Sequence, residues 1–380
     1  MKNPIKMNLS WHKWLLSGLL LFPLAYLSFK NLSYCSWVVM FPAVFIYLVI
    51  LGLKTRKNIL KTLFYNLSAI FLALFIYEGF LWIKFRSQSN SAQATTTGNF
   101  SNPHPYLGYG ASDDGIYSSK RTINNETIFD VSYTLKDGLR YTPNSNKNSL
   151  DCVLFFGCSV TFGEGLSDTL TLPFLFNKYA NLKYKVFNYG FSGYGPHQML
   201  SFIENRVVRD IQAVKNEKIA IYIYFNGHIA RAAGYSAWDQ KGPKYKSIDG
   251  NLKNVGNFSK LPQRILSILT KSFTYKRLFL ERKTSLSDLK LTTEIVKKSK
   301  ELLLREGVIL YVFILNDKEK NKEDDYFVAE MKKHGIKTFL RSDAIPDYYK
   351  NEEKYILHKL DKHPNGLTNE KIAKYLCSQL

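Results

Sequence analysis

The chain has 380 residues, 46% of them hydrophobic, which is enough to bury a real core in one large or two smaller units. Its formal net charge is +21, from 52 basic and 31 acidic residues, and the excess forms no Arg-rich stripe. Such a chain suits anionic membranes or acidic glycans, and no nucleic-acid partner is expected. The cysteines match no metal-binding spacing and imply no disulfide framework; they are Cys35, Cys152, Cys158 and Cys377.

Three apolar stretches open the chain, each close to the ~20 residues that a helix needs to cross a bilayer. They are Trp11–Phe29, Tyr34–Leu53 and Leu63–Ile83. Tryptophans stand near their ends, as in the aromatic belts of membrane interfaces. We therefore predict three transmembrane helices; buried core helices are the less favoured alternative.

Basic residues give these spans an orientation. Residues 1–97 hold ten basic residues and one acidic residue, and most of the basic ones precede the first span or lie between the second and third. The positive-inside rule then places the N-terminus in the cytoplasm and everything after residue 86 outside. We expect a multi-pass protein of the cytoplasmic (inner) membrane with a periplasmic or extracellular C-terminal domain. If the first span is a cleaved signal peptide, that domain still lies outside.

Glu78 is the acidic residue of this region and falls within the third predicted span. An ionisable residue inside a membrane is a functional candidate by default. Because Glu78 lies close to the outer end of the span, a side chain that reaches toward the interface is the favoured interpretation.

The sequence predicts four regions. Residues 1–86 form the membrane region, and residues 87–98, which are small, polar and uncharged, form a linker. Residues 99–150 form an N-terminal extension of the main domain, with a strand pair at Thr127–Leu135 and Leu139–Thr142 around Lys136–Asp137–Gly138. Residues 151–380 form the main domain.

Strands and helices alternate in the main domain, which predicts an α/β layered fold with a mostly parallel sheet. Two of the strands are continuous apolar runs, as strands buried on both faces are. In such sheets, ligands bind at the carboxyl ends of the strands. The predicted strands are Asp151–Phe156, Tyr184–Asn188, Ile219–Phe225, Val308–Leu315 and Lys337–Leu340, and the clearest helices are Ser287–Glu306 and Glu323–His334.

A nucleophile and a base stand at opposite ends of this domain. Ser159 follows the first strand directly, with Gly157 before it. A serine needs a base to become nucleophilic. His363 near the C-terminus can supply the base, and Asp361 can orient its imidazole.

Two segments between these ends are candidates for an oxyanion hole. Asn188–Gly195 follows the second strand, and its glycines leave backbone N–H groups accessible. Asn226, followed by His228, stands at the end of the third strand, where both side chains would point to the same face of an extended strand. Either side chain therefore qualifies as the donor there.

These four segments, in this order, resemble the four conserved blocks of the SGNH/GDSL hydrolase superfamily, and most closely a membrane-anchored bacterial subgroup. Gly157-Cys158-Ser159 stands in the nucleophile block, Gly193 in the second, Asn226 in the third, and Asp361 with His363 in the last. The resemblance implies a flavodoxin-like three-layer sandwich, with Ser159, His363 and Asp361 as catalytic triad. It also implies an oxyanion hole made by the N–H groups of Ser159 and Gly193 and by Asn226.

Three departures from the family pattern stand out. Cys158 replaces the usual acidic residue before the serine, Tyr224-Phe225-Asn226-Gly227 replaces the usual third block, and Asp361 lies two rather than three residues before the histidine. Cys158 is not expected to be the nucleophile, because it should point away from the site. His228, Arg231 and His197 are candidates for substrate contact, and structural hydrogen bonding is the alternative for each.

The sequence thus predicts a membrane-anchored serine esterase that acts on acyl esters of an envelope glycan or a lipid-linked saccharide. An O-acyltransferase on the same fold is the first alternative, and a non-catalytic glycan-binding or assembly protein is the second. No metal or organic cofactor is expected. The expected partners are the acylated saccharide and the bilayer, with a membrane acyltransferase as a further candidate.

Overall fold

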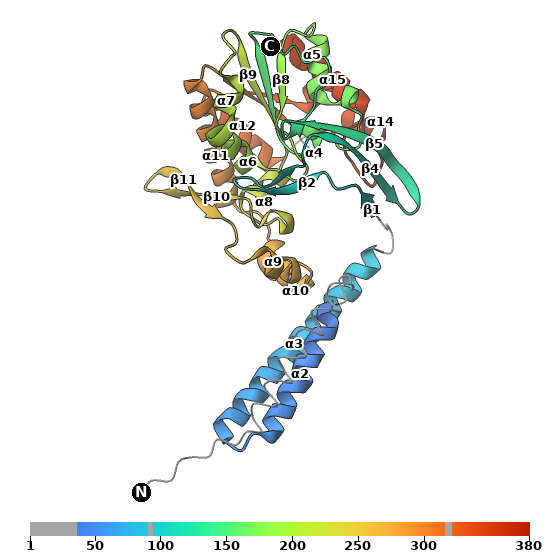
Figure 1. Cartoon of the computed structure of the whole chain (residues 1–380), viewed down its shortest axis with the longest axis vertical. Coiled ribbons are helices and arrows are strands. Elements are labelled where there is room, and N and C mark those ends of the chain that lie inside the picture. Colours follow the sequence, from blue (N-terminus) through green and yellow to red (C-terminus); the bar gives the residue numbers. More distant parts are fainter. Residues whose placement is uncertain (1–35, 90–93, 316–320) are drawn as a thin grey trace. The chain divides into compact units, whose positions relative to one another are not determined.

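A computed structural model describes residues 36–89, 94–315 and 321–380 (Figure 1). The described chain forms two compact units. The first unit holds the helices before residue 90 together with Leu261–Glu281, and we call it the membrane unit after the spans that the sequence predicts. The α/β unit holds Ser91–Lys260 and Arg282–Leu380. The predicted first span, Trp11–Phe29, lies outside the described residues.

The described part of the membrane unit begins with two helices, α2 (Ser36–Lys54) and α3 (Asn58–Ser89). Within α3, Asn58–Lys84 is long and apolar enough to cross a membrane, and only 6% of its most apolar window is buried. The predicted third span is therefore a helix of sufficient length. The apolar part of α2 in the described residues, Met40–Lys54, is shorter, so one candidate span stands where three were predicted.

The segment Leu261–Glu281 returns to these helices from the middle of the C-terminal region, which the sequence did not predict. It contains α9 (Gln263–Leu269), α10 (Phe273–Tyr275) and a π-helical turn η4 (Lys276–Leu280). The indole Nε1 of Trp37 in α2 donates to the carbonyl of Ile268 at 2.9 Å. Side chains of α3 and α9 pack around Trp37 and Phe41 of α2.

Glu78 is fully buried within the membrane unit. Its carboxylate accepts hydrogen bonds from Ser272 Oγ at 2.9 Å, Phe273 N at 2.7 Å and Thr274 N at 2.8 Å. A carboxylate at the start of a helix satisfies N–H groups that have no partner within that helix. The sequence predicted a side chain that reaches toward the interface; in the structure the carboxylate of Glu78 fastens α10 to α3.

The α/β unit is built on a nine-stranded sheet in the order β1-β4-β5-β6-β8-β7-β9-β12-β13. The last five strands in this order are parallel, and the first four extend the sheet in antiparallel fashion through the pairing of β6 with β8. The strands are β1 (Ala94–Thr97), β4 (Gly115–Ile123), β5 (Glu126–Lys136), β6 (Leu139–Arg140), β7 (Cys152–Phe156), β8 (Lys185–Asn188), β9 (Lys218–Tyr224), β12 (Ile309–Ile314) and β13 (Lys337–Leu340). Two hairpins stand apart, β2 (Ser101–His104) with β3 (Gly108–Ala111), and β10 (Pro243–Ile248) with β11 (Asn251–Asn257).

Helices cover both faces of the parallel strands, which confirms the predicted three-layer α/β fold (Figure 1). Side chains alternate along β7: Val153 and Phe155 face α5 and α15, whereas Leu154 and Phe156 belong to the cluster that contains α6, α11 and α12. These helices are α5 (Leu172–Tyr179), α6 (Pro196–Phe202), α11 (Leu286–Arg305), α12 (Lys322–Lys333) and α15 (Gly366–Gln379). The shorter elements are α4 (Ser159–Phe162), η1 (Asp168–Leu170), η2 (Ile203–Val207), α7 (Val208–Ile211), α8 (Gly227–Ala232), η3 (Ala237–Asp239), α13 (Arg341–Ala344), η5 (Tyr348–Lys350) and α14 (Glu352–Tyr355).

The strand order marks where chemistry is expected. Among the parallel strands, β7 comes first in sequence and lies between β8 and β9, so the chain moves to one side of β7 and then to the other. In doubly wound sheets, ligands bind at this reversal point, outside the carboxyl end of the strand. The residues that follow Phe156 occupy that position.

Candidate active site

Ser159 lies at the carboxyl end of β7 and begins α4. The turn requires Gly157, which has φ of +151°, because a Cβ there would lie 2.2 Å from Thr161 Oγ1. This close approach lets the chain pass from strand to helix within two residues. Ser159 retains 9% exposure.

His363 and Asp361 complete a hydrogen-bonded chain with Ser159. His363 Nε2 lies 2.9 Å from Ser159 Oγ, and His363 Nδ1 lies 2.6 Å from Asp361 Oδ1. Lys362 between them has φ of +61°, a left-handed conformation that turns the backbone sharply. This turn brings the side chains of Asp361 and His363, which are two residues apart in the sequence, into contact. The backbone N–H of His363 also donates to the Asp361 carboxylate at 3.1 Å.

The charges around this chain favour a basic imidazole. Burial alone would lower the pKa of His363, but the hydrogen bond to Asp361 and the negative charges of Glu164 and Asp361 outweigh it, so this pKa lies above its usual 6.5. Burial would likewise raise the pKa of Asp361, but the hydrogen bond and charge of His363 and the charge of Arg121 hold it below 3.8. Arg121 Nη1 lies 3.0 Å from Asp361 Oδ2.

The loop Asn188–Gly195 packs beside the nucleophile turn. Asn188 Nδ2 donates to Thr161 O at 3.0 Å, while its Oδ1 accepts from Gly190 N at 3.0 Å. Gly193 has φ of +81°, and its N–H, like that of Ser159, has no acceptor among the described residues. Both N–H groups therefore remain available to a ligand.

The third predicted block has a different local structure from the one expected. Strand β9 ends at Tyr224, and Asn226 already precedes helix α8, so Asn226 and His228 do not share a strand face. Asn226 is partly exposed; its Oδ1 accepts from Tyr224 Oη at 3.2 Å, and its Nδ2 has no partner among the described residues. Asn226 thus keeps an amide N–H to donate.

His228 is fully buried in the core, which contradicts its predicted contact with substrate. Its Nδ1 lies 2.6 Å from Tyr222 Oη, and its ring stacks on that of Tyr222. Burial, followed by the charges of Arg231 and His197, holds the pKa of His228 well below 6.5. This neutral histidine is part of the packing under the site.

The other two predicted contact residues, His197 and Arg231, contact residues of the η3 turn, which carries Trp238. His197 is fully buried, and its Nε2 lies 2.5 Å from Asp239 Oδ2, so the structure does not support contact of His197 with substrate. Arg231 Nη1 donates to Tyr194 O at 2.7 Å, and its guanidinium lies 5.9 Å from the centroid of the Trp238 ring. Trp238 is 59% exposed and donates through Nε1 to Gly193 O at 3.3 Å.

Four residues of this region were not predicted from the sequence: Arg121, Glu164, Trp238 and Asp239. Arg121 comes from β4, in the N-terminal extension, and no local motif signals its pairing with a residue near the C-terminus. Glu164 accepts from Ser192 Oγ at 2.6 Å, and it stands between two glycines shortly after Ser159, which is the signal that could have found it.

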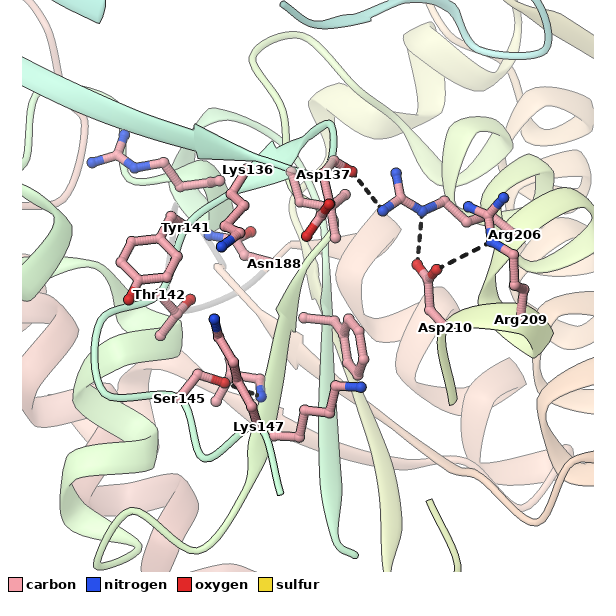
Figure 2. Close-up of a pocket in the computed structure, with 15 residues that line it drawn as sticks. Lys136, Asp137, Tyr141, Thr142, Ser145, Lys147, Asn188, Arg206, Arg209 and Asp210 are labelled. Carbon is pink, nitrogen blue, oxygen red and sulfur yellow. Dashed lines mark hydrogen bonds and ion pairs between the residues drawn. The ribbon is translucent and has the colours of Figure 1, made fainter. Parts of the chain in front are cut away.

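A large cleft of about 840 Å³ in the α/β unit is separate from the triad (Figure 2). Basic side chains outnumber acidic ones in its lining, and none of Ser159, His363 and Asp361 belongs to it. Arg206 there is engaged with Asp210 at 2.7 Å and with the carbonyl of Asp137 at 2.6 Å. The chemistry of the triad therefore takes place elsewhere.

The assembled groups have the geometry for acyl transfer. A serine hydroxyl within hydrogen-bond distance of an imidazole, itself oriented by a buried carboxylate, matches the requirements of an activated nucleophile. The three predicted oxyanion donors, Ser159 N–H, Gly193 N–H and Asn226 Nδ2, are all unengaged within the described residues.

No protein-family model matches the chain, and no curated protein matches it. Solved structures with some similarity include a candidate SGNH hydrolase from Slackia heliotrinireducens, with 9% identity and a TM-score of 0.31 over 61% of this chain and 98% of that one. An acetyl xylan esterase from the rumen bacterium Butyrivibrio proteoclasticus has 9% identity and a TM-score of 0.35 over 76% and 97%. A protein from Bacillus subtilis has 7% identity and a TM-score of 0.36 over 76% and 73%.

Proposed function

We propose that this chain is a membrane-anchored serine esterase of the SGNH/GDSL type. The hydrogen-bonded chain from Ser159 through His363 to Asp361 carries the proposal. Ser159 and His363 are 204 positions apart in the sequence, and the fold brings them together at the carboxyl end of β7. A binding module on the same fold has no need of an assembled triad, which argues against the non-catalytic alternative.

The proposed reaction has two steps. Ser159 Oγ attacks the acyl carbonyl carbon while His363 Nε2 takes the hydroxyl proton, and Asp361 stabilises the resulting imidazolium. The intermediate collapses, the alkoxide leaving group takes the proton from His363, and the acyl group stays on Ser159. A water molecule, deprotonated by His363, then attacks the acyl-enzyme and releases the carboxylic acid and Ser159.

An acylated saccharide is the proposed substrate class. Trp238, largely exposed and hydrogen-bonded to the carbonyl of Gly193, offers an aromatic face beside a predicted oxyanion donor. Aromatic faces of this kind pack well against the apolar faces of sugar rings. The apolar helix α3 supports placement at a membrane, where envelope glycans and lipid-linked sugars are found.

A serine-directed fluorophosphonate probe tests the catalytic proposal. Wild-type protein and the Cys158→Ala variant should be labelled, and the Ser159→Ala and His363→Ala variants should not. Labelling of Ser159→Ala but not of Cys158→Ala would show that the nucleophile is wrong. No labelling of a folded wild-type protein would favour a binding module.

The acceptor separates esterase from O-acyltransferase, because both share the acyl-enzyme. An acetyl donor should yield acetate alone when no saccharide is present. If adding a glycan acceptor diverts the acetyl group onto the glycan, the chain is a transferase.

A further inference from the structure

The segment Leu261–Glu281 of the membrane unit exposes large apolar side chains. Leu278 and Phe279 in η4 are 51% and 54% exposed, and Leu261 and Ile265 are also exposed. Leu266 and Leu280, in contrast, are buried. The segment therefore has an inner apolar side that packs within the unit and a second apolar side whose large side chains are exposed.

The segment is fixed to α2 and α3 by polar bonds as well as by packing. Trp37 bonds the carbonyl of Ile268, and the buried carboxylate of Glu78 accepts three hydrogen bonds from Ser272 to Thr274. An unsatisfied carboxylate in an apolar environment is costly, so Glu78 requires these donors. The attachment is therefore specific.

The level of this attachment along α3 follows from helix geometry. The candidate span Asn58–Lys84 has 27 residues, or about 40 Å at ~1.5 Å per residue, against a hydrocarbon core of ~30 Å. Glu78 lies about 9 Å before the end of this span, and hence within about 5 Å of the edge of a centred hydrocarbon core. This is the depth at which amphipathic segments lie in membrane interfaces.

The charge of the segment fits the same location. The segment has a net charge of +3, because it holds four basic residues, Arg264, Lys271, Lys276 and Arg277, and one acidic residue, Glu281. Basic side chains beside exposed apolar ones are typical of segments that bind anionic headgroups and insert into the acyl boundary.

We propose that Leu261–Glu281 is a second membrane contact, which lies in the interface beside α3 and binds anionic lipid. Ile265, Leu278 and Phe279 enter the acyl boundary, and Arg264 and Arg277 face the headgroups. The proposal rests on α3 as a membrane span, and it is independent of the esterase chemistry.

The accessibility of spin labels to oxygen and to a nickel complex tests the membrane contact of Leu261–Glu281. The full-length protein is reconstituted into vesicles of phosphatidylglycerol and phosphatidylethanolamine. Labels are attached through Ile265→Cys and Phe279→Cys in a background without Cys35 and Cys377. Ile76→Cys, on the exposed side of α3, is the lipid control, and Lys215→Cys, exposed in the α/β unit, is the water control. Collisions with oxygen report lipid, and collisions with a water-soluble nickel complex report solvent.

We expect the labels at 265 and 279 to behave like Ile76→Cys and opposite to Lys215→Cys. Nickel accessibility at 265 and 279 with a lipid-exposed Ile76→Cys would overturn this proposal alone. A water-exposed Ile76→Cys would overturn the membrane span too. Labels shielded from both reagents would mean that a protein partner covers the segment, which also overturns the proposal.

A change of lipid tests whether the basic side chains of the segment bind anionic headgroups. In neutral phosphatidylcholine vesicles, the label at 279 should lie closer to water, and Arg264→Gln with Arg277→Gln should have the same effect in anionic vesicles. The same depth in both lipids would overturn the assignment to anionic lipid. Fluorophosphonate labelling of Ser159 should persist in all these variants.

Discussion

Two charged neighbours of His363 act on its pKa in opposite directions. The carboxylate of Asp361 raises that pKa through a hydrogen bond and its charge, and the guanidinium of Arg121 lowers it. In the proposed mechanism the neutral imidazole is the catalytic base, so activity should be lost as pH falls through the pKa of His363, which lies above 6.5.

We expect Asp361→Asn to lower kcat by about 10²–10⁴, and less than His363→Ala does, because an orienting group contributes only part of what the base does. The acidic limb of the kcat/KM profile should move to lower pH. Full activity would mean that another carboxylate serves instead. Two other carboxylates that precede Asp361 in the sequence are engaged elsewhere, since Asp347 accepts from Tyr355 Oη at 2.8 Å and Asp343 from Leu340 N at 3.4 Å.

Arg121→Met should move the acidic limb the other way, to higher pH, because a positive charge near His363 is lost. Arg121→Lys should keep the limb near its original position. Parallel pH profiles of kcat/KM for the two variants measure this. An unmoved limb in Arg121→Met would show that Arg121 only supports the fold.

Asn226 and His228 should separate cleanly in their effects. Asn226→Ala should lower kcat by about 10²–10³ with KM nearly unchanged, as expected for one oxyanion donor. His228→Ala should destabilise the fold by about 3 kcal/mol, because it opens a cavity and leaves Tyr222 Oη without its partner. Steady-state kinetics and thermal unfolding of both variants test these roles. If His228→Ala loses turnover but keeps normal stability, His228 rather than Asn226 is the oxyanion donor.

The sequence predicted Ser159, His363 and Asp361, which the structure brings together, because each stands in a short local pattern at a strand end or before a helix. It misplaced His228 because an extended strand was assumed to continue, whereas the chain turns into α8 after Phe225. No local pattern signalled Arg121, because its partner lies 240 positions further along the chain.

At the scale of elements, position 193 of the loop Asn188–Gly195 tolerates only glycine. A Cβ on Gly193 would lie 2.6 Å from both Trp238 Nε1 and Tyr109 Oη, in a left-handed conformation. The loop therefore depends on Gly193 to bring its N–H group and Trp238 together.

We expect Gly193→Ala to lower kcat by about 10² or more, because the loop must shift and carry its N–H donor with it. Gly250→Ala is the matched control, since Gly250 is also left-handed, with φ of +74°, but a Cβ there meets nothing within 4 Å. Both variants share the backbone strain of about 1–2 kcal/mol. Equal kcat losses would show that strain, rather than the loop position, is responsible.

Strands β9 and β12 were predictable because they are continuous apolar runs. The β5–β6 turn was predictable because Lys136–Asp137–Gly138 is a hairpin signal. The pairing of β6 with β8, which joins the extension to the sheet, was not predictable, since register between distant strands leaves no local trace. The same holds for β10 and β11, whose side chains are mostly exposed.

At the scale of the whole molecule, topology is the testable property. Alkaline phosphatase fused after residue 90 should be active, because the basic residues of the membrane region favour an external α/β unit. A cytoplasmic reporter fused at the same point should be inactive. An active cytoplasmic reporter with an inactive phosphatase would reverse the orientation.

Composition predicted an N-terminal membrane region and a separate C-terminal fold, and α3 with the α/β unit matches that division. It did not reveal that Leu261–Glu281 belongs to the membrane unit. Short helices with mixed polarity resemble surface loops in sequence, and only their packing against Trp37 and Glu78 distinguishes them.

That returning segment changes how the protein can be shed. A protease that cuts between α3 and β1 severs the chain but leaves Leu261–Glu281 on the C-terminal fragment, where it still packs against α2 and α3. The fragment should then sediment with the membrane after a single cut. Release of a soluble enzyme requires disruption of this packing as well, so one nick in the linker does not turn an anchored protein into a secreted one.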